Sequence, residues 1–389
     1  MLSPLIVLPT LSRYLDQSSF SYYLYLISLG SWMAVIVEFG FILSATRDIA
    51  CNNVDKLFCQ EKLYSVASAK IILSIILLFI TLIFTMYSTS MVYFLGWIYA
   101  VLLGFNYTWF FQGVRKLKVP LIAEFLGVII LILGVFILVC FGKGINWIIF
   151  VLFFSRVVSL IIYILLLKYT FRFRALSFKF VSAIEEIKKS FFSFLLISFV
   201  SFYTTFNVVY LGWVTMGVQL IYFAGAEKLI RAGCSLISPI SQAFLPEMTI
   251  RFREGIESGL KLFKYMMIFV TTIGLFMYLG ILIFSKLFIY LFLGKEYIYA
   301  QEYLIILGLM LPAVGLSSVL NMHFLVPFGK ESICAKIYFL AGISNLVLVF
   351  SLVRDFGAIV MAYSVVTSEY IVTIAMLIAV IKLIKKFRT

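Results

Sequence analysis

The chain has 389 residues, of which 64% are hydrophobic and 12% are charged, and its formal net charge at pH 7 is +14. Ordinary globular domains contain about 45–50% apolar and about 25% charged residues, so a soluble fold of this length could not bury this much apolar surface. The composition therefore excludes a water-soluble protein and predicts an integral membrane protein.

Long apolar runs, such as residues 71–84 and 126–141, predict transmembrane helices. In lipid, every backbone N–H and C=O must be hydrogen-bonded within the protein, which restricts spanning segments to helices and closed barrels. Barrel strands would alternate polar and apolar residues over segments of about ten residues. The runs in this chain are apolar on every side, so we predict an all-α, polytopic membrane protein.

The breaks between apolar runs predict about twelve spans in two six-helix bundles. In chain order these are 1–10, 20–45, 67–87, 92–111, 120–141, 146–167, 191–213, 218–243, 264–292, 299–325, 333–352 and 357–381. A crossing requires about 20 residues, so the first helix is expected to be truncated: either a stub or the end of a helix that begins upstream. We do not expect a signal peptide, because the basic leader is absent and a turn-like segment follows.

Lysine and arginine are distributed unequally between the two sides of the predicted membrane. The loops on the side of residues 46–70, together with the C-terminus, carry 23 of the 31, including Lys62, Lys70, Arg172 and Arg174; the opposite loops carry five. Cytoplasmic loops are enriched in these residues, so the bias predicts a multi-pass protein of the bacterial inner membrane with a cytoplasmic C-terminus. The net charge then reflects topology, not a nucleic-acid surface.

The longest polar interruption, at about residues 168–190, separates six predicted spans from six. Transporters are often built from two related bundles with the substrate path between them. We therefore predict an N-terminal bundle at residues 1–178 and a C-terminal bundle at 179–389. The outer loops are very short, which argues against an enzyme that acts on a periplasmic substrate.

The eighth predicted span contains a cluster of ionisable residues, Glu227, Lys228 and Arg231. An ionisable residue at the bilayer centre costs at least ~2.5–3.5 kcal/mol on insertion scales, so each one requires a reason. Glu227 and Arg231 form an i,i+4 pair in the favourable order, which leaves about one net positive charge. That charge is suited to a phosphate-bearing substrate. The alternative is a structural ion pair between helices.

Two further arginines lie in or beside predicted spans. Arg47 is at the cytoplasmic end of the second span, where it either guides an anionic headgroup or anchors the helix at the interface. Arg156 is within the sixth span and is expected to face the bundle interior. Four acidic residues are candidates for H⁺ or Na⁺ coupling, the alternative being pairing with a cation: Glu38, Glu124, Glu227 and Glu369.

Catalytic and cofactor motifs are absent from the sequence. There is no Gly-rich phosphate loop, no nucleophile with a base at usable spacing, and no fingerprint for NADPH or ATP. The five cysteines show no CxxC spacing and no pairing with the single histidine, His323. We therefore expect neither a disulfide framework nor a zinc site, and no enzyme or cofactor.

Three groups of segments point to a known family. They are LPTLSRYLDQSSFSYYLY (8–25) with EFGFILSATRDIA (38–50), WFFQGVRKLK (109–118), and YFAGAEKLIRA (222–232) with PISQAFLPEM (239–248). In order they resemble the opening, the W-x-F-Q-G loop and the segment with Tyr followed by Ala-Glu-Lys of the polysaccharide repeat-unit flippases, the Wzx group of O-antigen and capsule transporters. The resemblance covers essentially the whole chain, and the departure is at the N-terminus, where the family has most of another span.

The resemblance implies a twelve-span fold of the multidrug/oligosaccharidyl-lipid/polysaccharide exporter superfamily. It implies a substrate in lipopolysaccharide or other surface-polysaccharide biosynthesis: an oligosaccharide on undecaprenyl pyrophosphate, moved from the cytoplasmic to the periplasmic leaflet. It also implies inward-facing cationic roles for Arg47, Lys228 and Arg231, whereas Arg156 is added from its position alone. The expected partners are the lipid-linked oligosaccharide, membrane lipid, and the glycan polymerase and chain-length regulator of the same pathway.

Three other functions make different demands on the sequence. A drug/cation antiporter of the same superfamily would favour an acidic cleft, which Lys228 and Arg231 argue against. A membrane glycan polymerase or ligase would have a large outer loop, and a scaffold would lack a polar cluster at mid-span. We expect alternating access, because a polar, cationic cleft would avoid burying sugar hydroxyls in lipid at roughly 1–3 kcal/mol each.

Overall fold

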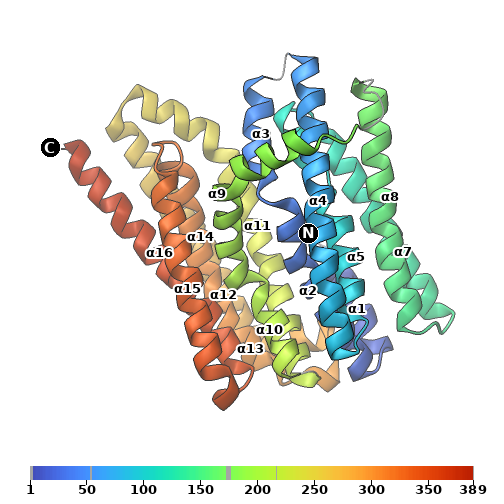
Figure 1. The fold of residues 1–389 in the computed structure, drawn as a ribbon. Coiled ribbons are helices and arrows are strands. Elements are labelled where there is room, and N and C mark those ends of the chain that lie inside the picture. Colours follow the sequence, from blue (N-terminus) through green and yellow to red (C-terminus); the bar gives the residue numbers. More distant parts are fainter. Residues whose placement is uncertain (1–2, 53–54, 172–176, 216, 389) are drawn as a thin grey trace. The chain divides into compact units, whose positions relative to one another are not determined.

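The computed structural model describes residues 3–52, 55–171, 177–215 and 217–388, and every regular element in these ranges is a helix (Figure 1). Ten helical stretches among the described residues are long and apolar enough to cross a membrane. The prediction of an all-α protein with many spans is therefore confirmed. The predicted spans outside these ten are the first and the eighth. The first predicted span is a helix of only 12 residues. The eighth predicted span lies in a helix of 37 residues that is interrupted by charged side chains.

The helices form two compact units, which we call the central unit (residues 25–201) and the terminal unit (residues 1–24 and 202–389). The central unit contains most of α2 (Gln17–Glu38), α3 (Phe41–Cys51), α4 (Lys56–Ser88), α5 (Val92–Gly104), α6 (Thr108–Gly113), α7 (Lys118–Cys140), α8 (Ile145–Phe171) and most of α9 (Phe180–Thr204). The terminal unit contains α1 (Ser3–Tyr14), α10 (Phe206–Val214), α11 (Val218–Glu254), α12 (Ile256–Phe292), the 3₁₀-helix η1 (Lys295–Tyr297), α13 (Ala300–Gly308), α14 (Met310–Leu320), the π-helix η2 (Asn321–Leu325), α15 (Glu331–Phe356) and α16 (Ile359–Arg388). The division into bundles at residues 178 and 179 stays a prediction.

The core of the central unit contains two of the motifs that carry the family resemblance, one in α3 and one in α6. Trp109, Phe110 and Phe111 of α6 are buried in one cluster with the inner face of α3. The Thr46 hydroxyl donates to the carbonyl of Trp109 at 3.0 Å. A Cβ atom at Gly113 would lie 2.6 Å from the Ile49 side chain, so only glycine permits this close approach. The W-x-F-Q-G segment is therefore a packing element that locks α6 against α3.

A kink between α2 and α3 allows the backbone of α9, in the same unit, to approach closely. Gly40 has a φ of 74°, and a Cβ atom there would lie 2.5 Å from the backbone nitrogen of Phe194. The ring of Phe39 stacks on that of Phe194, with centroids 4.2 Å apart. Ser44 and Ser190 share a hydrogen bond of 2.7 Å one turn further along. The kink thus fixes the position of α9 against α3.

In the terminal unit, α15 packs along α16, and α11 packs on α12 and α13. The short helix α1 lies on α11 and α12. Its Arg13 guanidinium donates to the carbonyls of Tyr290 and Leu291 at 3.1 and 2.7 Å. Carbonyls in the last turn of a helix have no partner in that helix, and a cation there is favourable. Arg13 therefore caps α12 and holds α1 in place.

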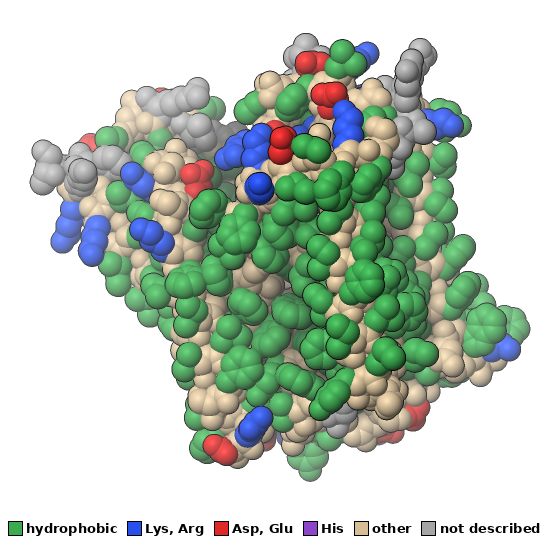
Figure 2. Space-filling model, in the orientation of Figure 1, with side chains coloured by type: hydrophobic (Ala, Val, Ile, Leu, Met, Phe, Trp, Pro, Cys, Tyr) green, Lys and Arg blue, Asp and Glu red, His purple; other side chains and the backbone are tan. Residues whose placement is uncertain are grey.

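Charged side chains of the central unit gather at the end formed by α3 and the start of α9, while its flanks are hydrophobic (Figure 2). The sequence analysis counted Lys62 and Lys70 among the loop cations, and this assignment is wrong. α4 begins at Lys56, well before the predicted start of the span at 67, so both lysines lie within the helix, and both are buried. Arg172 and Arg174 lie outside the described residues. The cytoplasmic C-terminus stays a prediction.

Candidate functional site

An ion cluster in the terminal unit contains the residues that the sequence singled out in the eighth span. The Arg231 Nε donates to the Glu227 carboxylate at 2.8 Å. Its terminal nitrogen donates to the carbonyl of Thr204, the last residue of α9, at 3.1 Å. The Glu227 side chain is 4% exposed. The i,i+4 pair expected from the spacing is thus present, with its carboxylate buried and the Arg231 side chain 31% exposed.

A second carboxylate reaches this cluster from α16. Glu369 is buried and interacts electrostatically with Arg231. Two tyrosines, Tyr203 of α9 and Tyr338 of α15, interact electrostatically with Glu369. The sequence analysis expected one net positive charge in the eighth span. The structure adds Glu369, which balances it, because residues so far apart in the chain cannot be paired from spacing alone.

Lys228 is the exception within this cluster. Its charge interacts at longer range with Glu227 and Arg231. Among the described residues its ammonium makes no hydrogen bond and no ion pair, although the side chain is half-buried. A strongly hydrated ammonium in such a position is suited to bind an anion as a point charge.

The central unit holds a second polar site around Arg156. The Arg156 guanidinium donates to Glu124 of α7 at 3.1 Å. The Tyr163 hydroxyl donates to the other Glu124 oxygen at 3.3 Å and shares a hydrogen bond of 2.9 Å with Thr108. These side chains line a cavity of about 240 Å³. The Arg156 Nε is buried without a partner in the part of the chain that the structure describes. Tyr163 was not singled out by the sequence.

Glu38, another predicted coupling residue, belongs to a separate network in the central unit. Its carboxylate accepts a hydrogen bond from the Asn106 side chain. The ammonium of Lys70 interacts electrostatically with Glu38 and donates to the carbonyls of Gly104 and Asn106. The sequence analysis missed Lys70 as an intramembrane residue. The available signal was its position between two apolar stretches, SVASA and IILSIIL.

A third network ties together the charged end of the central unit. The Lys62 ammonium lies 2.6 Å from carboxylate oxygens of both Asp48 and Glu186. Lys189 lies 3.7 Å from Asp48. Partial burial opposes the charge on Asp48, but the ammonium of Lys62 and two further cations outweigh it and hold the pKa of this carboxyl below its ordinary value. Arg47 is exposed and makes no hydrogen bond among the described residues.

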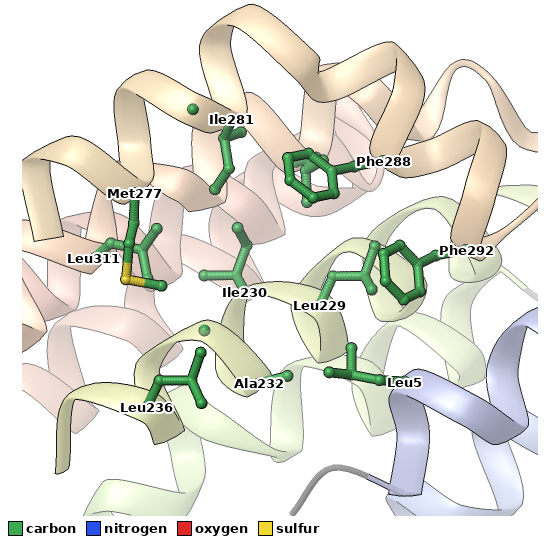
Figure 3. A pocket seen from close by; sticks show the side chains of 13 residues that line it. Leu5, Leu229, Ile230, Ala232, Leu236, Met277, Ile281, Phe288, Phe292 and Leu311 are labelled. Atoms are coloured by element: carbon green, nitrogen blue, oxygen red, sulfur yellow. The ribbon is translucent and has the colours of Figure 1, made fainter. Parts of the chain in front are cut away.

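The opposite face of α11 borders an apolar groove in the terminal unit. Figure 3 shows side chains of α11 and α12 facing each other across it, with Leu5 of α1 at one side. The groove has a volume of about 320 Å³, and all thirteen lining residues are apolar or glycine. By helical spacing, its α11 residues lie away from Arg231, and Lys228 lies between the two faces. One helix therefore separates a charged site from a hydrocarbon-lined one.

Comparison with known proteins places these features in context. The sequence model described as "Polysaccharide biosynthesis protein" matches residues 1–250. A protein of Shigella dysenteriae named "Putative O-antigen transporter" is 30% identical over 390 residues, which covers 97% of this chain and 96% of the relative. A protein of Escherichia coli (strain K12) with the same name is 26% identical over 388 residues, covering 97% and 92%.

Solved structures share the fold at low sequence identity. The lipid II flippase MurJ in an inward closed conformation is 16% identical, with a TM-score of 0.71 over 97% of this chain and 85% of that one. An inward-facing multidrug transporter of the MATE family, in the MOP superfamily, is 14% identical, with a TM-score of 0.72 over 100% and 95% of the two chains. The fold is that of these transporters.

Proposed function

Because the chain belongs to the polysaccharide biosynthesis protein family, we propose that it is a flippase for lipid-linked oligosaccharide repeat units of O-antigen or another surface polysaccharide. The carrier lipid would be undecaprenyl pyrophosphate, and the direction from the cytoplasmic to the periplasmic leaflet of the inner membrane, with the C-terminus in the cytoplasm. A glycan polymerase and a chain-length regulator are the partners expected to receive the product.

The physical problem for such a substrate is its headgroup. The polyprenyl tail is already stable in lipid, at ~0.8 kcal/mol per buried CH₂. Sugar hydroxyls and the diphosphate are not, since burying a charge without a partner is far more costly than burying a hydroxyl. We propose that the polar sites of the two units are exposed alternately to the two sides, so that the headgroup crosses without entering lipid. An inside-negative potential favours this outward movement of anionic charge, at ~2.3 kcal/mol per charge per 100 mV.

The observation that carries the proposal is the ammonium of Lys228, which has no partner among the described residues and lies beside the partly exposed Arg231. A diphosphate would accept a charge-assisted hydrogen bond from Lys228. It would also compete with Glu227 for Arg231, so that binding of the substrate and release of the carboxylate are linked. The carboxylates Glu227 and Glu369 are then the groups to which a coupling H⁺ or Na⁺ would bind in this unit.

Lys228→Ala tests the proposed function in cells. In a host whose own repeat-unit flippase is deleted, the variant should restore lipopolysaccharide ladders roughly tenfold to a hundredfold less well than the wild type, because hydrogen bonds to charged groups contribute about 1.5–3 kcal/mol. Protein abundance should be unchanged, since no buried partner of Lys228 is left without its counter-charge. Lys228→Arg should retain activity.

The matched control is Lys264→Ala, which removes an exposed lysine of α12 and should leave the ladders normal. Normal ladders from Lys228→Ala at normal abundance would remove the anion site from the proposal. Failure of the wild type itself to restore ladders, at normal abundance, would instead favour a drug/cation antiporter.

The apolar groove supports the same substrate class. We propose that it holds part of the polyprenyl tail while the diphosphate lies near Lys228, at the junction of the two faces of α11. A Cβ atom at Gly280 would meet nothing within 4 Å, so a side chain there would extend into the groove without a backbone clash.

Gly280→Leu is therefore expected to lower transport several-fold while leaving the thermal stability of the purified protein equal or slightly higher, since leucine is a better helix former than glycine by almost 1 kcal/mol. Flipping of a fluorescent polyprenyl diphosphate glycan in proteoliposomes would measure it. Gly144→Leu is the control, because Gly144 is also surrounded by open space but does not line the groove. Equal transport by both variants would contradict a role for the groove.

A further inference from the structure

Lys70 carries a positive charge in the interior of a membrane-spanning helix, and no carboxylate of the described residues forms an ion pair with it. It lies near the middle of α4 and is 2% exposed. Its ammonium is held by two backbone carbonyls, that of Gly104 at 2.6 Å and that of Asn106 at 3.2 Å. Gly104 is the last residue of α5. Carbonyls at a helix C-terminus lack partners within the helix and carry partial negative charge, so they attract a cation.

A carboxylate completes the surroundings of the ammonium at longer range. Glu38, the last residue of α2, interacts electrostatically with Lys70. The Asn106 side chain donates to Glu38, so the same residue offers its carbonyl to the lysine and fixes the carboxylate. The oxygen atoms around the ammonium are therefore two carbonyl oxygens in contact with it and one carboxylate farther away. Hard oxygen donors of these two kinds are those that alkali and alkaline-earth cations use in proteins.

The carboxylate also explains why a cation is required at this position. Removal of one member of a buried charge pair leaves the other uncompensated, which is strongly destabilising. Glu38 is half-buried within a membrane-spanning segment. If the lysine side chain were absent, the carbonyls and Glu38 would still present negative charge to the space that it leaves.

We propose that this place in the central unit is a monovalent-cation site that Lys70 fills with its own ammonium. The positive charge at this site is thus part of the polypeptide chain itself, and Na⁺ is not required there. Truncation of Lys70 should convert the site into one that binds free Na⁺. The inference does not rest on the proposed transport function, since it concerns the occupancy of one site in the folded protein.

The test is the thermal unfolding of purified wild type, Lys70→Ala and Lys70→Met in NaCl and in choline chloride at equal ionic strength. Lys70→Ala leaves room for an ion, whereas methionine fills the space without a charge. We expect the Tm of Lys70→Ala to rise by roughly 3 °C or more in Na⁺ at about ten times its Kd, because a ligand that binds only the folded state stabilises it. The wild type and Lys70→Met should show no difference between the two salts that Glu38→Gln removes, because Na⁺ bound to the carboxylates of the terminal unit would not depend on Glu38.

A second change locates the effect. Adding Glu38→Gln to Lys70→Ala should abolish the Na⁺ dependence, since Glu38 is the one carboxylate among the described residues that acts on Lys70. A Lys70→Ala protein that folds equally well in both salts would overturn the proposal. So would a Na⁺-specific rise in the Tm of the wild type that Glu38→Gln removes, because the lysine would then not fill the site. This wild-type measurement decides the question even if Lys70→Ala cannot be recovered.

Discussion

Arg231→Ala is expected to abolish transport and to lower the free energy of unfolding by about 3–5 kcal/mol, the usual effect of leaving a buried charge without its partner. The Glu227 side chain is 4% exposed and Glu369 is 7% exposed, so both carboxylates would remain buried without their counter-charge. The carbonyl of Thr204 would also lose its donor. Thermal unfolding in detergent, membrane abundance and lipopolysaccharide ladders measure the three consequences.

The chain contains a matched control for this change. Arg251 and Glu247 form the same i,i+4 pair at 2.9 Å, but both side chains are about half exposed. Arg251→Ala should change the Tm little, because exposed ion pairs contribute little to stability. Adding Glu227→Gln to Arg231→Ala should recover part of the lost stability but not transport. A fully stable Arg231→Ala protein would contradict the stabilising role that we assign to Arg231 between the two carboxylates and Thr204.

Lys62→Ala is expected to have a stability effect of similar size in the central unit. Its ammonium lies 2.6 Å from carboxylate oxygens of Asp48 and Glu186, and its side chain is 4% exposed. Without it, two neighbouring carboxylates of α3 and α9 would repel each other, at an expected loss of about 3–5 kcal/mol. Hydrogen exchange of α9 and thermal unfolding would both report this loss.

Lys179→Ala is the control for Lys62, because the Lys179–Glu61 pair at 3.1 Å is much more exposed. It should change stability by less than about 1 kcal/mol. The pH dependence has a defined sign: the pKa of Asp48 is lowered in the folded state. Its stabilising contribution is therefore fully present above its unfolded pKa of about 3.9 and is lost as the pH falls through the lower folded value. Equal losses from Lys62→Ala and Lys179→Ala would contradict this account.

The fold class was predictable because lipid imposes one requirement on every residue of a span, and composition reports it directly. The Glu227–Arg231 pair was also predictable, since four residues make one turn of a helix. The approach of Glu369 to Arg231 was not, because helical periodicity locates a residue on its own helix but does not identify the neighbouring helix.

Lys62 and Lys70 show a different limit. Each has a charge that favours a loop by its residue type, so both were counted as loop cations, and the predicted third span began at residue 67, beyond Lys62. In the structure, their charges are compensated by groups on other segments: carboxylates from α3 and α9 for Lys62, and carbonyls after α5 for Lys70. A buried lysine becomes acceptable only through contacts that the local sequence does not contain. The W-x-F-Q-G segment, a loop according to the resemblance, is in the structure the short helix α6, whose aromatic residues lie in the core.

The burial of Lys70 has a bioenergetic consequence. A charge that is covalently attached to the chain returns with the protein in every turnover and cannot be released on the far side of the membrane. It therefore adds nothing to the current per substrate molecule and draws no energy from an ion gradient. If the central unit is neutralised in this way, the electrical sign and stoichiometry of the cycle are set by the diphosphate of the proposed substrate and by the ion that binds the carboxylates of the terminal unit.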